Sequence, residues 1–221
     1  MIFTRKKTAL IVGLILGILI LVKHSGILNW MYMPINTMEP NIQKNSTVLI
    51  SNIPKIENSD IIIFRKKESG DPYVYRIVGM ENDTILIKNG ILYRNNKRAD
   101  TNYEVIYDYK VSKEVFHKIK NSKHIYHPFF STQIAYMDTL LVAADKNFAV
   151  NHNLTRYIID KQDVEEEIKN QFQKNWNRDN FGPLIIPAKK CFVMGDNRGN
   201  SWDSRYFGLI DNNQIIGKVI F

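Results

Sequence analysis

The sequence predicts a mostly β protein of the α+β class, in which a single N-terminal transmembrane helix precedes an antiparallel β core that carries an inserted subdomain. Three observations predict this fold. An uncharged apolar run occupies Thr8–Val22, short β-branched runs separated by turn residues follow it, and the pattern becomes mixed between about Asn95 and Lys190. With 221 residues, the chain is long enough for one domain with an insertion.

The apolar run Thr8–Val22 has 15 residues, fewer than the roughly 20 that a spanning helix needs. Lys23 can snorkel, and Trp30 with its neighbours can extend the apolar surface to the interface. A cleavable signal peptide is the alternative, because residues 5–7 are basic, but no Ala-x-Ala-like site follows. We expect a cytoplasmic tail at 1–7 and an uncleaved anchor at 8–28 in the cytoplasmic (inner) membrane, with the main domain extracytoplasmic.

Strands are predicted wherever β-branched runs alternate with Asn, Pro, Gly and Asp. Asn89-Gly90 predicts a hairpin, because a type I′ turn needs positive φ at both central residues. A helix is expected over Asp160–Trp176, capped by Asp163. We therefore expect a β core at 33–94 and 190–221, interrupted by an α/β insertion at 95–189. The predicted strands before the insertion are Ser46–Ser51, Asp60–Phe64, Tyr73–Val78 and Thr84–Lys88.

The net charge of +8 includes +4 from the basic residues that flank the apolar run, so about +4 is spread over the remainder. The sequence has no concentrated basic stripe or nucleic-acid-reading motif, which argues against nucleic-acid binding. Its single cysteine, Cys191, has apolar neighbours and is expected to be buried and inert. The five histidines lack metal-ligand spacing, so we predict neither a metal site nor a cofactor.

The last 30 residues, Phe192–Phe221, read FVMGDNRGNSWDSRYFGLIDNNQIIGKVIF. This stretch resembles the C-terminal signature of type I signal peptidases (peptidase family S26), in which GDN-x-x-x-S-x-DSR precedes G and IIGK. Other segments follow in that family's order. The segment TMEPNI resembles the nucleophile motif S-M-x-P-T-L, and DIIIF with YVYRIVGMENDTI resembles DIVVF with Y-x-K-R-V-x-G-x-x-GD. The resemblance covers about residues 8–95 and 180–221.

The resemblance implies a membrane-anchored, mostly antiparallel β fold with serine-type endopeptidase chemistry and no cofactor. The family hydrolyses the bond after small residues, typically Ala-x-Ala, as secreted preproteins leave the translocation machinery. A serine is the nucleophile and a buried neutral lysine is the base, since burial lowers the pKa of lysine. The implied partners are the signal peptides of secreted preproteins and the cytoplasmic membrane.

Both positions of this Ser–Lys pair differ in the present chain. The match places Thr37 at the nucleophile position and Tyr75 at the general-base position. Threonine keeps a hydroxyl and serves as a nucleophile in some hydrolases, although its extra methyl stiffens χ1. Tyrosine has a usual pKa of about 10, which burial raises further, so at neutral pH it is a phenol and a poor base.

A third departure is Ile35, which stands where many members have a serine that stabilises the oxyanion. Loss of one such donor can cost about 10²–10³ in rate. The sequence also offers no evident substitute base for Thr37. The basic side chains considered, none of which a spacing rule places beside Thr37, are Lys66, Lys67, His124 and His152.

The family's supporting positions are otherwise kept. In the family, the serine that matches Ser201 supports the lysine, whereas here Ser201 could instead hydrogen-bond the Tyr75 hydroxyl. The acid and arginine that match Asp203 and Arg205 pair to brace the site. The other matching residues are Met38, Pro40, Arg76, Gly195, Asp196, Asn197 and Arg198.

Three functional hypotheses follow. The first is a pseudoenzyme: a signal-peptidase-I-like membrane protein that binds signal peptides but is catalytically impaired. The second is an active signal peptidase that uses Thr37 as its nucleophile. The third is an interaction partner of an active signal peptidase paralogue.

Overall fold

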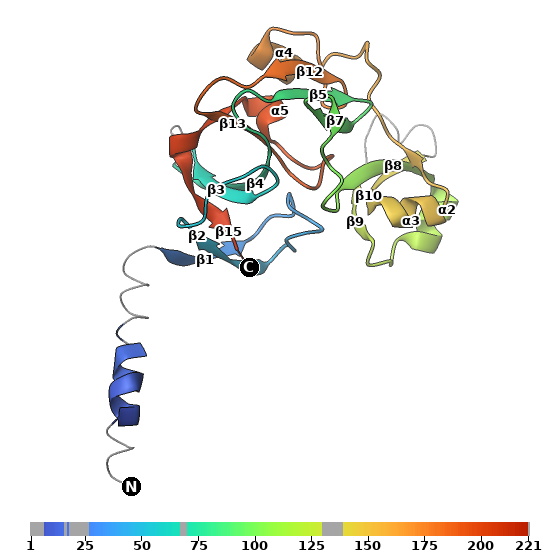
Figure 1. Ribbon diagram of the computed structural model, residues 1–221. Helices are drawn as coiled ribbons and strands as arrows, with labels where there is room; N and C mark the ends of the chain where they lie inside the picture. Colours follow the sequence, from blue (N-terminus) through green and yellow to red (C-terminus); the bar gives the residue numbers. More distant parts are fainter. Residues whose placement is uncertain (1–6, 16, 18–26, 67–69, 130–138, 221) are drawn as a thin grey trace.

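The computed structural model describes residues 7–15, 17, 27–66, 70–129 and 139–220. Residues 7–15 are helical, and in Figure 1 they lie away from the folded body. None of the helices within the described residues is long and apolar enough to span a membrane. Much of the predicted anchor, residues 16 and 18–26, falls outside the described residues, as does most of the predicted tail.

The main body is built on a seven-stranded sheet with the order β1-β2-β15-β3-β4-β13-β14, in which every strand pair is antiparallel. The mostly antiparallel β core predicted from the sequence is thus confirmed. The N-terminal and C-terminal parts of the chain meet in this sheet, because β15, near the C-terminus, lies between β2 and β3. The strands are β1 (Leu28–Met33), β2 (Ser46–Ser51), β3 (Ile61–Arg65), β4 (Pro72–Gly79), β13 (Lys190–Met194), β14 (Ile210–Asp211) and β15 (Ile215–Val219).

A second, four-stranded sheet has the order β12-β5-β6-β7 and packs beside the first. Asn89 (φ 49°) and Gly90 (φ 68°) connect β5 to β6, which confirms the predicted type I′ hairpin. Helix α4 covers this sheet, with Ile168 and Phe181 in a shared apolar cluster (Figure 1). The elements are β5 (Thr84–Lys88), β6 (Ile91–Arg94), β7 (Lys97–Arg98), α4 (Glu166–Phe172) and β12 (Phe181–Ile185).

A third sheet, with the order β11-β8-β10-β9, forms a separate lobe with its own apolar cluster (Figure 1). We call it the cap sheet. Two short helices lie against it, and the side chains of Ser112 and Asp145 accept hydrogen bonds that cap their N-termini. The elements are β8 (Ile106–Ser112), α2 (Lys113–Ile119), β9 (Ile125–Phe129), β10 (Thr139–Asp145), α3 (Lys146–Asn151) and β11 (Thr155–Arg156).

The predicted insertion at 95–189 contains the cap sheet, but it also contains β12, which pairs with β5 of the second sheet. The cap sheet contacts the main body directly. Ile106 at the start of β8 forms a parallel bridge with Asn197, between β13 and α5 (Ser204–Phe207). The cap sheet therefore contacts residues 195–205 (GDNRGNSWDSR), which we call the closing motif.

The helix predicted over Asp160–Trp176 is shorter than expected, and Asp163 does not cap it. The observed helix α4 spans Glu166–Phe172 and ends at Gln173 in the left-handed conformation (φ 56°). The helix begins later than predicted because Asn177 Nδ2 donates to the carbonyl oxygens of Asp160 (2.7 Å) and Asp163 (2.6 Å). A buried amide thus organises residues that the apolar pattern alone assigned to a helix.

Cys191 on β13 is fully buried, and burial raises the pKa of its thiol to about 12. A thiol with that pKa stays protonated at neutral pH and is a poor nucleophile. The prediction that Cys191 is buried is confirmed.

Candidate active site

Thr37 lies in a turn that follows β1. The backbone N–H of Glu39 donates to the Asn36 carbonyl oxygen (3.2 Å), and that of Ile42 donates to the Met38 carbonyl oxygen (2.9 Å). Met38 is fully buried in the main apolar cluster and fixes the turn against the core. Neighbouring Ile35, in contrast, is 47% exposed. The turn thus holds Thr37 at the edge of the core, next to an exposed isoleucine.

Tyr75 lies on β4 within the same apolar cluster as Met38. The rings of Phe64 and Phe207 are centred 6.2 and 6.0 Å from its ring. Its hydroxyl donates a hydrogen bond to the carbonyl oxygen of Trp202 (2.8 Å). Burial, with the nearby Asp203 carboxylate second, raises the pKa of Tyr75 well above the usual value for tyrosine. Tyr75 is therefore a neutral hydrogen-bond donor at physiological pH.

Arg76, the next residue on β4, forms an ion pair with Asp196 of the closing motif. Its Nε and Nη2 donate to the two carboxylate oxygens of Asp196 at 2.8 and 2.6 Å. Asn41 Nδ2 donates to the same carboxylate (2.8 Å). Burial raises the pKa of Asp196, and Arg76 opposes that rise. This bidentate pair ties the Thr37 turn, β4 and the closing motif together.

Asp203 and Arg205 form a second buried pair. Arg205 donates from Nε and Nη2 to the Asp203 carboxylate, both at 2.8 Å. The same carboxylate accepts the N–H of Gly195 (3.1 Å), and Arg205 Nη2 also donates to the carbonyl oxygen of Arg198 (2.9 Å). Burial opposes the charge of Arg205, but Asp203 keeps its pKa raised. The pair thus bonds both ends of residues 195–205 to one another.

Thr37 and Ser201 both lie against Gly195. The N–H of Asn197 donates to the carbonyl oxygen of Thr37 (3.0 Å). A Cβ added at Gly195 would lie 2.8 Å from that oxygen and would clash with Ser201 Oγ, so only glycine fits. Within the part of the chain that the structure describes, Thr37 Oγ1 and Ser201 Oγ are buried and have no hydrogen-bond partner.

The hydrogen bond anticipated between Ser201 and Tyr75 is not the main contact of the tyrosine. Ser201 lies close enough to oppose the rise in the Tyr75 pKa, yet its Oγ makes no hydrogen bond of good geometry to a described residue. The Tyr75 hydroxyl donates its hydrogen bond instead to the carbonyl oxygen of Trp202. Among the described residues, no hydrogen bond joins the Tyr75 hydroxyl to Thr37 Oγ1.

The candidate substitute bases also lie elsewhere. Lys66 Nζ sits 3.4 Å from the ring centre of Phe207. His124 Nδ1 is 2.8 Å from an Asp145 carboxylate oxygen, and His152 stacks on Phe148 in the cap sheet lobe. None of these side chains bonds Thr37 Oγ1. Lys67 falls outside the described residues.

Three residues that had been given no role contribute to the site. The carbonyl oxygen of Trp202 accepts a hydrogen bond from the Tyr75 hydroxyl. Trp202 is 53% exposed, and its ring stacks on Tyr206 with centroids 4.5 Å apart. Asn36 accepts from Asn200 Nδ2 (3.0 Å), and Asn41 joins Asp196. Trp202 stands inside the quoted motif, but a backbone role leaves no signal in the side-chain pattern. Among the described residues, no group of three His, Cys, Asp or Glu side chains could hold a metal ion.

Comparisons with known proteins agree with the retained motifs. The chain is 29% identical over 194 residues to signal peptidase I of Buchnera aphidicola subsp. Baizongia pistaciae, covering 80% of this chain and 57% of that protein. It is 28% identical to signal peptidase I of Bacillus caldolyticus, covering 84% and 73%. Signal peptidase IB of Staphylococcus aureus is 26% identical, covering 84% and 72%. The chain thus spans a little over half the length of the Buchnera protein.

A solved structure, signal peptidase I from Enterococcus faecalis V583, aligns with a TM-score of 0.36 and 20% identity, covering 76% of this chain and 98% of that chain. Residues 5–221 match the family described as signal peptidase, peptidase S26. That match spans nearly the whole sequence, and it includes the Thr37 turn, strand β4 and the closing motif. The resemblance to type I signal peptidases is confirmed, and the chain belongs to the signal peptidase family, peptidase S26.

Proposed function

We propose that this chain is a catalytically impaired member of its family, a membrane protein of the secretory pathway that binds signal peptides without cleaving them efficiently. The observation that carries the proposal is the engagement of Tyr75. Its hydroxyl donates to the Trp202 carbonyl oxygen, and burial keeps it protonated. A base for Thr37 must instead present a lone pair to the threonine hydroxyl at about 2.6–3.2 Å.

The loss of the base outweighs the change of nucleophile. Thr37 Oγ1 still has a hydroxyl proton to give, but no described side chain is placed to take it. Removing one member of a nucleophile–base unit generally costs several orders of magnitude in turnover. Ile35 adds a smaller deficit, because its side chain offers no hydrogen bond to an oxyanion.

Exposed apolar side chains beside this region favour retained binding of an apolar peptide. Ile35 is 47% exposed next to Thr37, and Trp202 is 53% exposed next to Tyr75. Neither side chain depends on the missing base. Both can contact an extended apolar peptide while the chemical step is absent.

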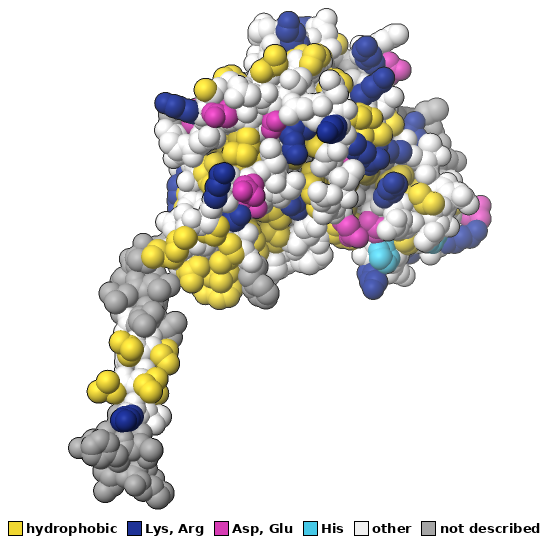
Figure 2. Space-filling model, viewed as in Figure 1, with side chains coloured by type: hydrophobic (Ala, Val, Ile, Leu, Met, Phe, Trp, Pro, Cys, Tyr) yellow, Lys and Arg dark blue, Asp and Glu magenta, His cyan; other side chains and the backbone are white. Residues whose placement is uncertain are grey.

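A membrane location is supported by one face of the β1–β2–β15 ribbon. Trp30 pairs with Leu49, and the backbone N–H of Ile220 bonds the Leu49 carbonyl oxygen, so these side chains share a face. Trp30 is 66% exposed and Ile220 44% exposed. Figure 2 shows hydrophobic side chains gathered at this base of the body, beside the N-terminal segment. This surface, with the basic residues 5–7, favours a body resting on the outer side of the cytoplasmic membrane.

The proposal is tested by measuring cleavage and binding separately on the full chain in detergent. A preprotein with an Ala-x-Ala site should remain intact, while a fluorescent peptide carrying the same site should bind. An Asp-substituted site in the same peptide is the control for binding. Cleavage at a rate typical of the family, abolished by Thr37→Ala, would replace the proposal with an active peptidase that uses Thr37.

A further inference from the structure

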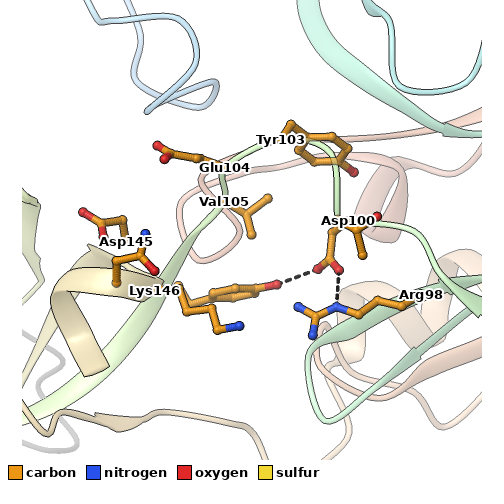
Figure 3. Close-up of a pocket in the computed structure, with 10 residues that line it drawn as sticks. Arg98, Asp100, Tyr103, Glu104, Val105, Asp145 and Lys146 are labelled. Carbon is orange, nitrogen blue, oxygen red and sulfur yellow. Dashed lines mark hydrogen bonds and ion pairs between the residues drawn. The ribbon is translucent and has the colours of Figure 1, made fainter. Parts of the chain in front are cut away.

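A cavity of about 290 Å³ lies where β7 and the following loop meet the cap sheet (Figure 3). We call it the cap cavity. Its walls include the aromatic rings of Tyr103 and Tyr107, together with Val105. It contains neither Thr37 nor Tyr75, nor any residue of the closing motif. The cap cavity is therefore a second concave site, outside the candidate active site, of a size that suits a small ligand or a few residues of peptide.

Of the three carboxylates that line the cavity, Asp100 and Asp145 are already paired. The Asp145 carboxylate accepts the N–H of Phe148 (2.8 Å), and its other oxygen lies 2.8 Å from His124 Nδ1. Asp100 is buried, and its carboxylate accepts hydrogen bonds from Arg98 Nε (2.9 Å) and the Tyr107 hydroxyl (2.7 Å). Arg198 Nη1 lies 3.8 Å away. Burial opposes ionisation, yet Arg198 and these two donors hold the pKa of Asp100 below its usual range. Asp100 thus stays charged and paired, so it offers nothing to a cationic ligand.

Two cationic groups of the cavity keep free donors. The Arg98 side chain is 40% exposed, and only its Nε is used by Asp100. Lys146 is an exposed residue at the start of α3. Among described residues, neither the terminal Arg98 nitrogens nor Lys146 Nζ has a hydrogen-bond acceptor. Figure 3 shows both side chains extending to the same side of the cavity.

This arrangement selects for one kind of anion. A guanidinium and an ammonium beside aromatic and apolar walls fit a carboxylate attached to an apolar or aromatic residue. Glu104 on the rim is exposed and repels anions, so it disfavours a ligand with two negative charges more strongly than a single carboxylate. We propose that the cap cavity binds the carboxylate of a short peptide segment, with Arg98 and Lys146 as its ligands.

The walls of the cavity connect with the Thr37 turn. Arg198 lies behind Asp100 and Tyr103, donating from Nη2 to the Tyr103 hydroxyl (3.4 Å) and from Nε to the Gly195 carbonyl oxygen (3.1 Å). Asn197, the residue before it, bonds the carbonyl oxygen of Thr37. A peptide in the cap cavity would therefore contact Tyr103 and Asp100, which connect to the Thr37 turn through Arg198 and Asn197.

The test is calorimetric titration of the full chain in detergent micelles with N-acetyl-Ala-Ala-Tyr bearing a free C-terminal carboxylate. The same peptide as an amide should bind at least about tenfold more weakly, since it loses charge-assisted hydrogen bonds. N-acetyl-Ala-Asp-Tyr-amide distinguishes a side-chain carboxylate from a C-terminal one, and binding of either supports the proposal. Equal binding of acid and amide, or tighter binding of inorganic phosphate, would overturn it.

Charge-removing variants locate the binding. Lys146→Met and Arg98→Met should each weaken binding of the free acid about tenfold. Their controls, Lys123→Met and Lys97→Met, remove exposed positive charges outside the cavity and should bind as the unmodified chain does. Because Arg98 also supports Asp100, Lys146→Met decides the matter if Arg98→Met folds poorly. Unchanged affinity in Lys146→Met contradicts the assignment.

Discussion

The motif match predicts that Tyr75 occupies the position at which the family's chemistry needs a base. A lysine amine there would be desolvated and could accept a proton near neutral pH. The phenol has the opposite response to the same environment, because burial disfavours its charged, basic form. In the proposed account, a tyrosine at this position is a hydrogen-bond donor to the Trp202 carbonyl oxygen, where a lysine would be a proton acceptor for Thr37.

The first prediction concerns Tyr75→Phe. At pH 7 the variant should lose about 1 kcal/mol of unfolding free energy, because the Trp202 carbonyl oxygen loses its donor. The pKa of Tyr75 is raised in the folded state, so its contribution to stability is complete below about pH 10 and is lost as the pH rises further. Urea unfolding at pH 7 to 11 should therefore show a shallower alkaline decline for Tyr75→Phe.

The control for this series is Tyr32→Phe. Tyr32 is 56% exposed and its hydroxyl donates to Asn45 on the surface, so at pH 7 the loss should be smaller. An alkaline decline in Tyr75→Phe as steep as that of the unmodified chain would contradict a buried, protonated Tyr75.

The motif match predicts the site residues, and in the structure the Thr37 turn, β4 and residues 195–205 contact one another. It could not show what each atom bonds. The Trp202 carbonyl oxygen and the Asn41 amide take part through contacts across the fold, and such contacts leave no local spacing pattern. The same limit applies to Ser201. The Tyr75 hydroxyl, which was expected to bond Ser201, donates instead to the backbone carbonyl oxygen of Trp202.

At the scale of elements, local turn chemistry was the most reliable signal. The Asn89-Gly90 hairpin was predictable because the required backbone conformation restricts the residue types. The helix at 160–176 was not, because the buried amide of Asn177 competes for the carbonyl oxygens of Asp160 and Asp163. The cap sheet lobe lies in a mixed segment, whose strands alternate less regularly than those of the main core.

The second prediction concerns Gly90→Ala. Gly90 has φ +68°, which costs an L-residue about 1–2 kcal/mol, and an added Cβ would clash with Arg156 Nη2. We expect the unfolding free energy in urea to fall by at least that amount. Asn89→Gly at the neighbouring position (φ 49°) is the control and should change stability little. Equal effects of the two variants would contradict the assigned turn.

At the scale of the whole molecule, buried ion pairs hold the cap sheet against the main body. Arg178 Nη2 donates to Asp108 on β8 (2.9 Å), and its Nη1 donates to the Gly199 carbonyl oxygen (3.0 Å). Both side chains are largely buried, with 15% and 13% exposed. Burial raises the pKa of Asp108, and Arg178 opposes the rise. The closing motif therefore belongs to the candidate active site and also contacts, through Arg178, the cap sheet.

The third prediction is that Asp108→Asn lowers the unfolding free energy by about 2–3 kcal/mol, because Arg178 loses its nearest carboxylate and keeps only Asp179, 3.8 Å away. The double variant Asp108→Asn/Arg178→Met should recover part of this loss, which a double-mutant cycle in urea measures. Strictly additive effects would show that the pair does not couple the cap sheet to the main body.

The measurement that tests the central claim most directly is cleavage of an Ala-x-Ala preprotein by four forms of the full chain: unmodified, Thr37→Ser, Tyr75→Lys and the double variant. We expect the unmodified chain and Thr37→Ser to be inactive, and the double variant to gain activity, because the braces formed by Arg76–Asp196 and Asp203–Arg205 are intact. Efficient cleavage by the unmodified chain, lost in Thr37→Ala, would contradict the account and require a base other than Tyr75.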